Sequence, residues 1–131
     1  MLLDTSGLLC LIDKRGPRQE RAAEMYDRAT VRLTHNYIPA ELVALGNSRG
    51  VSRQTVLEFS DQLLADAEVE LVWIDEALHR QALDLLLARL DKTYSLCDAV
   101  SFVLMRERGE TEALTTDRHF EQEGLVRLFA I

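Results

Sequence analysis

The chain contains 131 residues, of which 47% are hydrophobic and 28% are charged, and its formal net charge is −7. This length fits one domain with one hydrophobic core, so we predict a single domain over residues 1–131. The composition excludes a low-complexity protein, and the negative charge argues against a protein that attracts nucleic acid over its whole surface.

The first segment, MLLDTSGLLCLIDKR, is apolar, but Asp4 interrupts it and it is too short to span a membrane. Cys10 and Cys97 lack the paired spacing of a zinc site or of a redox motif. We therefore expect two free thiols in a reducing compartment. The sequence predicts a cytoplasmic protein that has no contact with a membrane.

Short apolar runs alternate with helical patterns along the chain. The runs predict strands at residues 1–4, 31–35, 70–74, 112–116 and 125–129. Helices are predicted between them at residues 5–13, 18–29, 38–49, 53–66, 75–90 and 97–108, with a short turn at 118–123. The repeated alternation of strand and helix predicts an α/β fold with a parallel sheet of about five strands.

Two acids lie at the ends of predicted strands: Asp4 closes the first, and Asp117 follows the fourth. Ligands of parallel sheets bind outside the carboxyl ends of the strands, so both acids lie at the edge where a site is expected. Each acid also precedes a helical segment and, taken alone, is most simply explained as an N-cap. Neither acid is informative by itself.

Two further acids, Asp98 and Glu41, lie on predicted helices. Asp98 opens the apolar segment CDAVSFVLM, where a buried carboxylate needs a partner, although stabilisation of the helix dipole also explains it. Glu41 borders the core-facing stripe of YIPAELVALGN and can stay in solvent or reach inward over the sheet edge. If the four acids converge, their mutual repulsion requires protonation or a bound metal. Such a cluster suits Mg²⁺ or Mn²⁺ and metal-assisted hydrolysis of phosphodiester bonds.

Four segments, LLDTS, PAELV, YSLCDAVSFVLM and LTTDRHF, together resemble the PIN-domain ribonucleases, in particular the VapC-type toxins of toxin–antitoxin pairs. The resemblance covers the whole chain, and the segments occur in the family's order. It implies a three-layer α/β/α sandwich, endoribonuclease activity on structured RNA and a site for Mg²⁺ (or Mn²⁺). It also implies a homodimer and an antitoxin partner that places a basic side chain among the acids.

The resemblance assigns the catalytic and metal-binding roles to four acids: Asp4, Glu41, Asp98 and Asp117. Thr115 and Ser6 match family hydroxyl residues, which would orient the carboxylates or a water molecule. His119 also matches the family pattern, and we interpret it as a loop residue or as a contact to the acids, not as a general base.

Basic residues near these segments are candidates for contact with RNA phosphates. They are Arg49, Arg53, Lys92 and Arg118. Each of them is also explained as a solvated residue at a helix end. Tyr94 is a candidate for stacking on a base, with ordinary packing as the alternative, and His79 is predicted to lie on a helix surface.

The alternative function is a PIN-like module that binds RNA or a protein without cleaving RNA. Such a module is expected to lack one or more acids, whereas all four are present, which favours an enzyme. An aspartyl phosphotransferase would need a second acid where Ser6 stands. A homodimer is favoured by apolar residues of the helices at 38–66 that exceed the needs of one core face: Val43, Val56, Phe59 and Leu63.

Overall fold

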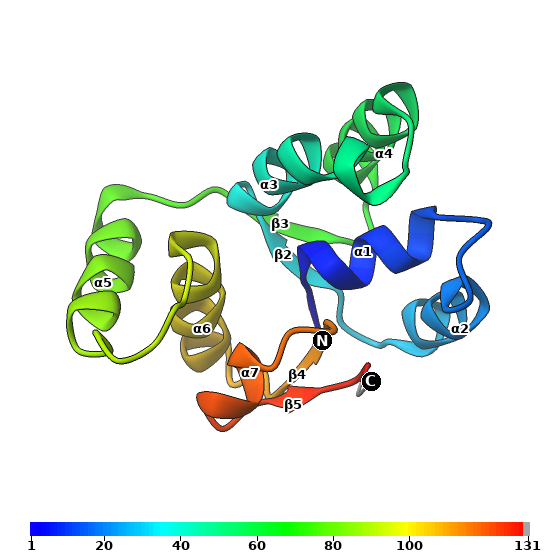
Figure 1. Ribbon diagram of the computed structural model, residues 1–131. Coiled ribbons are helices and arrows are strands. Elements are labelled where there is room, and N and C mark those ends of the chain that lie inside the picture. The colour runs from blue at the N-terminus through cyan, green and yellow to red at the C-terminus, as the bar shows by residue number, and fades with distance from the viewer. Residues whose placement is uncertain (130–131) are drawn as a thin grey trace.

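The computed structural model describes residues 1–129, which form a five-stranded parallel sheet with helices on both faces (Figure 1). The strand order is β3-β2-β1-β4-β5. The strands are β1 (Leu2–Leu3), β2 (Leu33–His35), β3 (Glu70–Val72), β4 (Glu112–Leu114) and β5 (Val126–Arg127). The predicted α/β class with parallel strands is confirmed.

Each strand is shorter than the segment predicted for it. The predicted segments followed continuous apolar residues, which indicate burial on both faces of a sheet and not the extent of the hydrogen-bonded ladder. Thr115, for example, is fully buried although it lies beyond the last residue of β4.

Seven α-helices connect or follow the strands among residues 1–129. They are α1 (Thr5–Ile12), α2 (Gln19–Arg28), α3 (Tyr37–Leu45), α4 (Arg53–Ala65), α5 (Glu76–Leu87), α6 (Leu96–Arg108) and α7 (His119–Gln122). The helix predicted at 38–49 ends earlier, because α3 stops before Gly46 and a short 3-10 turn, η1 (Asn47–Arg49), follows. None of these helices is both long enough and apolar enough to cross a membrane.

The strands separate two hydrophobic cores. Leu3 and Leu114 pack with residues of α1 to α4, whereas Leu2 and Ala113 pack with residues of α5, α6 and α7. Successive residues of a strand point to opposite faces, so β1 and β4 each contribute one residue to each core. Figure 1 shows α5 and α6 on one side of the sheet and α1 and α2 on the other. The architecture is therefore a three-layer sandwich.

The apolar residues that favoured a homodimer mostly serve the core of a single chain. Val56 and Leu63 are 2% and 3% exposed, and Val43 and Phe59 pack against the same core. The argument for a dimer from these four residues is therefore wrong. Their burial follows from the turn at η1, which folds α4 back against α3.

The strand order reverses between β1 and β4, because the chain first adds β2 and β3 on one side of β1 and later adds β4 and β5 on the other. Helix α1 begins directly after β1, and Gly7 allows it to pack closely on β4. A Cβ atom at Gly7 would lie 1.9 Å from the carbonyl oxygen of Leu114. Parallel sheets bind ligands at such a reversal, so a site is expected at the carboxyl ends of β1 and β4.

Candidate active site

A cavity of about 240 Å³ lies at the carboxyl ends of β1 and β4. The four acids singled out in the sequence all line it: Asp4, Glu41, Asp98 and Asp117. They come from the end of β1, from α3, from the first turn of α6 and from the segment after β4. The fold therefore brings together four carboxylates that are far apart in the sequence.

Asp4 is the most deeply buried of these acids. It occupies the N-cap position of α1, but its carboxylate does not cap the helix, so the N-cap interpretation of this side chain is wrong. Oδ2 accepts hydrogen bonds from the hydroxyls of Thr115 at 2.7 Å and Ser6 at 3.3 Å. Oδ1 is buried and has no hydrogen-bond partner among residues 1–129. A buried carboxylate oxygen without a partner is costly, and this oxygen is available to a ligand.

Two hydroxyl groups join Asp4 to the segment after β4. Because Thr115 donates its proton to Asp4, its oxygen accepts the N–H of Asp117 at 3.0 Å. The Ser6 hydroxyl, 3.0 Å from the Thr115 oxygen, shares its single proton between that oxygen and Asp4 Oδ2. The Ser6 oxygen in turn accepts the N–H of Thr116 at 2.9 Å. These bonds hold Asp117 in a fixed place relative to Asp4.

Asp98 lies in the first turn of α6, where it forms a capping box with Ser95. The N–H of Asp98 donates to the Ser95 hydroxyl at 3.0 Å, and the N–H of Ser95 donates to Asp98 Oδ2 at 3.1 Å. The helix begins at Leu96, one residue before its predicted start. The pattern S-x-x-D at residues 95–98 is the sequence signal of such a box. The capping role therefore coexists with a place at the cavity.

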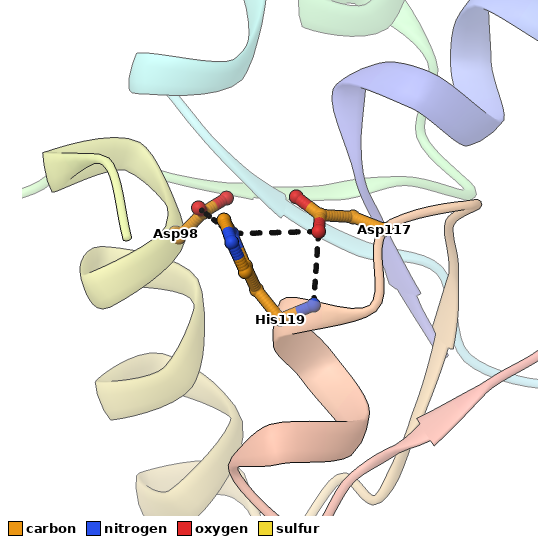
Figure 2. A group of neighbouring side chains, drawn as sticks. All are labelled: Asp98, Asp117 and His119. Atoms are coloured by element: carbon orange, nitrogen blue, oxygen red, sulfur yellow. Dashed lines mark hydrogen bonds and ion pairs between the residues drawn. The ribbon is translucent and has the colours of Figure 1, made fainter. Parts of the chain in front are cut away.

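Figure 2 shows His119 between Asp98 and Asp117. Its Nδ1 atom lies 3.0 Å from Asp98 Oδ2 and 3.4 Å from Asp117 Oδ1. The backbone N–H of His119 donates to Asp117 Oδ1 at 2.9 Å, so Asp117 binds the first N–H of α7 although the N-cap position belongs to Arg118. One possible ligand atom from each of the three residues lies within 4.8 Å of the others. His119 is thus a contact to the acids, which is one of the two positions that the sequence suggested.

The carboxylates influence each other's protonation. Burial raises the pKa of Asp4 to about 7, the hydrogen bond from Thr115 opposes this rise, and the charges of Asp98 and Glu41 add to it. Burial also raises the pKa of Asp98, against the hydrogen bonds from Ser95 and His119. Glu41 lies outside the group of three shown in Figure 2, but its negative charge reaches Asp4 across the cavity. The site is an acidic cluster that favours bound protons or cations.

The four basic residues proposed for RNA contact occupy different environments. Arg49 lines the cavity beside the acids. Lys92 forms an ion pair with Asp91 at 3.4 Å and does not line this cavity. Arg53 and Arg118 are exposed and also lie outside the cavity lining. The structure therefore brings only Arg49 of these four to the acids.

Two other sequence interpretations change with the structure. Tyr94 is 8% exposed, and its hydroxyl donates to Glu123 at 3.0 Å, so it packs in the protein and does not offer its ring to a base. His79 is not merely a helix-surface residue, because its Nδ1 atom contacts the hydroxyl of Tyr37 and thereby joins α5 to α3.

Glu123, which the sequence analysis did not single out, is a buried ionic centre behind the site. Its carboxylate accepts hydrogen bonds from Arg89 at 2.8 Å, from Arg106 at 2.5 Å and from the Tyr94 hydroxyl at 3.0 Å. The Tyr94 ring contacts the ring of His119 edge-on, with centroids 5.1 Å apart. No local pattern marks Glu123, because it follows a four-residue helix in a polar segment and its partners are distant in sequence.

The family model described as the PIN domain matches residues 1–124 of the chain. The chain belongs to the PIN-domain family. This PIN domain is similar to the 23S rRNA-specific endonuclease VapC20 from two strains of Mycobacterium tuberculosis, with 30% identity over 129 residues. The alignment covers 98% of this chain and 97% of the relative. The resemblance to VapC-type PIN-domain proteins is thereby confirmed.

A comparison with solved structures supports the fold. The crystal structure of Mycobacterium tuberculosis VapC20, described as a Sarcin-Ricin loop cleaving toxin, superposes on this PIN domain with a TM-score of 0.87. The superposition covers 97% of each chain at 24% sequence identity. The three-layer sandwich deduced above is therefore the fold of a solved PIN-domain protein.

Proposed function

We propose that this PIN-domain ribonuclease is the toxin of a toxin–antitoxin pair and hydrolyses phosphodiester bonds of structured RNA with a bound Mg²⁺ (or Mn²⁺). The observation that carries the proposal is the convergence of four acids on one cavity, with Asp4 Oδ1 buried and unpaired. The endonuclease activity that names the relative VapC20 supports it. The complete set of acids disfavours the alternative, a module that binds RNA or protein without cleavage.

The donor set at the cavity fits a hard divalent cation. Carboxylate oxygens are the ligands that Mg²⁺ and Mn²⁺ prefer, and the raised pKa of Asp4 reflects a charge that a cation would compensate. The residues that would hold the ion are Asp4, Glu41, Asp98 and Asp117. When bound, such an ion makes a water molecule nucleophilic and neutralises charge on the phosphate oxygens.

The chain's own residues hold these acids in position. Thr115 and Ser6 keep Oδ2 of Asp4 occupied, so that Oδ1 alone is available to a ligand. Ser95 and His119 in the same way fix Oδ2 of Asp98. Rotation of the carboxylates is therefore restricted before substrate binds. Because these groups are already in position, less conformational entropy is lost when the reaction occurs.

The substrate and the partners follow from the family. The relative acts on 23S rRNA, and the solved neighbour is described as cleaving the sarcin–ricin loop, so we propose a structured RNA hairpin as substrate. We also propose a cytoplasmic location and an antitoxin partner with a basic side chain that enters the acidic cavity. The net charge of −7 favours association with such a basic partner.

We further propose a homodimer, through a surface other than the one the sequence suggested. An apolar cavity of about 290 Å³ lies beside the edge strand β3, and its lining includes Pro39, Leu57, Leu64, Leu71 and Trp73. Trp73 is 68% exposed and Leu64 is 54% exposed, although both are large apolar side chains. A contiguous exposed patch of this kind indicates a protein contact.

The function is tested by incubating the protein with a hairpin RNA that has the sarcin–ricin sequence, with Mg²⁺ or with EDTA. We expect cleavage with Mg²⁺ only, and a loss of several orders of magnitude in Asp4→Asn, Asp98→Asn and Asp117→Asn. Asp84→Asn on α5 is the control and should cleave like wild type. Tight RNA binding without cleavage by the wild-type protein would instead establish the binding module.

A further inference from the structure

We infer that the RNA strand on one side of the cleaved bond lies in a groove along α1, where Arg49, Arg18 and Arg15 bind its phosphates. The inference rests on the proposed function, since it extends the path of the substrate away from the acidic cavity. Nothing in the family match or in the acidic cluster assigns this surface. The groove is defined by two cavities that continue from the site.

The first of these cavities adjoins the acidic one. It has a volume of about 210 Å³ and shares Ser6, Leu9 and Arg49 with the acidic cavity. Its remaining lining brings in Arg18, together with Asp13 and the thiol of Cys10. An RNA strand that leaves the acids along this side of α1 therefore meets Arg49 first and Arg18 next.

The second cavity continues in the same direction. It has a volume of about 380 Å³, shares Asp13 and Val51 with the first, and adds Lys14 and Arg15. Helix α1 has eight residues and is about 12 Å long. The groove thus runs from the acids at the start of α1 to basic residues beyond its end, which is long enough for more than one nucleotide.

The arginines of the groove differ from most other arginines of the protein in having no acidic partner. Six arginines form ion pairs with carboxylates: Arg32, Arg80, Arg89, Arg106, Arg108 and Arg127. Within residues 1–129, the side chains of Arg15, Arg18 and Arg49 form neither an ion pair nor a hydrogen bond to a carboxylate. Their guanidinium groups are therefore available to an anion from solution.

Two of these guanidinium groups approach the same point. Burial raises the pKa of the Cys10 thiol, while the positive charges of Arg18 and Arg49 both oppose the rise. Both charges therefore act on the Cys10 side chain, and all three residues line the first cavity. Asp13, the one acid that lines the first cavity, accepts the backbone N–H of Arg15 at 3.3 Å, and Glu58 is a further acid in the lining of the second cavity.

This arrangement favours a nucleic acid over a protein segment. Arginine binds phosphate oxygens through two parallel N–H groups, and a strand of RNA presents phosphates at regular intervals. The antitoxin proposed above is basic where it meets the acids, so three unpaired arginines would repel it. The acidic end of α1 suits a cation and the basic end suits the phosphates that flank the reacting one.

The test uses Asp98→Asn protein in EDTA, so that binding is measured without cleavage. The probes are the labelled sarcin–ricin hairpin and a labelled oligouridine, followed by fluorescence anisotropy at several salt concentrations. Arg15→Gln and Arg18→Gln should each weaken binding of both probes by about tenfold, the effect of one charged hydrogen bond. Each should also reduce the slope of log K against log salt by about 0.7.

The matched control is Arg28→Gln, which removes an exposed arginine of α2 that lines none of the three cavities. It changes the net charge by the same amount but lies outside the groove, so it should alter neither the affinity for RNA nor the slope of log K against log salt. In the cleaving protein, the groove variants should raise KM and leave kcat near the wild-type value. Cleavage failure in wild type would refute the proposed function, whereas wild-type cleavage with unchanged binding in the groove variants would refute the groove. Loss of antitoxin binding alone in those variants would also refute it and assign the surface to a protein.

Discussion

Asp98 and Asp117 are held close to each other by the starts of α6 and α7. Backbone N–H groups at helix starts favour carboxylates, so each acid is fixed by local structure that its own sequence neighbours provide. Asp4 is fixed differently, by hydroxyls from its own helix and from the segment after β4. Carboxylates fixed in this way cannot separate to relieve their repulsion, and the metal-free protein retains that electrostatic cost.

The variant Asp98→Asn tests this repulsion. The amide oxygen can still accept the N–H of Ser95, so the variant should be at least as stable as wild type in EDTA. At about 100 times its dissociation constant, Mg²⁺ should stabilise wild type by roughly 2.7 kcal/mol and the variant far less, which reverses the order. Thermal melts with and without Mg²⁺ measure both effects. Equal responses of the two proteins to Mg²⁺ would contradict the carboxylate cluster as a metal site.

His35 gives a second prediction, which concerns acid stability. The ring is fully buried, its Nδ1 accepts the N–H of Tyr37 at 3.2 Å, and its Nε2 therefore donates to the Ser101 hydroxyl at 2.8 Å. Burial lowers the pKa of His35 to about 3. In the unfolded chain the pKa is near 6.5, so only the unfolded state gains a proton between these values, and stability falls as the pH falls.

When the pH falls from neutral to about 5, protonation of His35 in the unfolded chain should lower the free energy of unfolding by roughly 2 kcal/mol. Asp4, whose pKa is raised, acts in the opposite direction, so the difference between wild type and His35→Gln isolates the histidine. Urea unfolding should show that the destabilisation caused by His35→Gln shrinks by that amount at the lower pH. Ser101→Ala removes the same hydrogen bond and keeps the histidine, so its destabilisation should not depend on pH. A pH-independent effect of His35→Gln would rule out this account.

At the scale of elements, Glu123 joins α7 to the segment before α6 and to α6 itself. Burial alone would raise the pKa of its carboxyl, but the hydrogen bonds from Arg106, Arg89 and Tyr94 outweigh burial and hold that pKa below its usual range. The Glu123 side chain is only 3% exposed. The short helix α7 therefore depends on this ionic contact for its position, and His119 depends on α7.

The variant Glu123→Gln should weaken that contact and displace His119. We expect a loss of about 1–3 kcal/mol in the free energy of unfolding, because charged hydrogen bonds to a buried group are lost. We also expect the Mg²⁺-dependent shift in melting temperature to shrink, since Asp98 and Asp117 both contact His119. Arg108→Gln breaks the exposed ion pair with Glu70 and serves as control, with at most about 1 kcal/mol lost and an unchanged response to Mg²⁺. An unchanged Mg²⁺-dependent shift in Glu123→Gln would show that the Glu123 contact does not position His119 at the acids.

The sequence predicted the helices and the acids better than it predicted contacts between distant elements. The helices were predicted within a few residues because caps such as Ser52, which accepts the N–H of Thr55, act locally. Asp4 and Asp117 were predicted because strand ends meet at one edge of a parallel sheet, whereas Asp98 and Glu41 lie on helices and were assigned to the site by the family resemblance. Glu123 and Tyr37 could not be found in this way, since their partners come from other elements and no local pattern encodes them. The glycine after α3 is likewise a matter of tertiary packing, because a Cβ atom at Gly46 would lie 2.4 Å from the side chain of Val56 on α4.

At the scale of the whole molecule, one group of exposed apolar residues lines a cavity that shares no residue with the acidic cavity. Leu57 and Leu64 on α4 and Trp73 after β3 are 45%, 54% and 68% exposed, and all three line the same cavity. Because β3 is the edge strand, we propose that this patch meets its own copy across a two-fold axis. The patch and the acidic cavity have no lining residue in common.

Trp73→Glu tests the dimer. At roughly tens of micromolar, light scattering should give the mass of a dimer for wild type and of a monomer for the variant. The variant should melt like the wild-type monomer, because Trp73 is exposed within one chain. Leu90→Glu changes a residue that is 81% exposed and lies outside this patch, so it should remain a dimer.

The fluorescence of the protein offers an independent measurement, since the chain has one tryptophan. Dilution of wild type should shift its emission to longer wavelength as Trp73 leaves the apolar interface and enters water. The Leu90→Glu protein should show the same shift at the same concentration. If wild type is monomeric by light scattering and its emission does not change on dilution, Trp73 is solvated at all concentrations and the dimer proposed at this surface is wrong. If wild type is dimeric and Trp73→Glu remains so, the interface lies elsewhere.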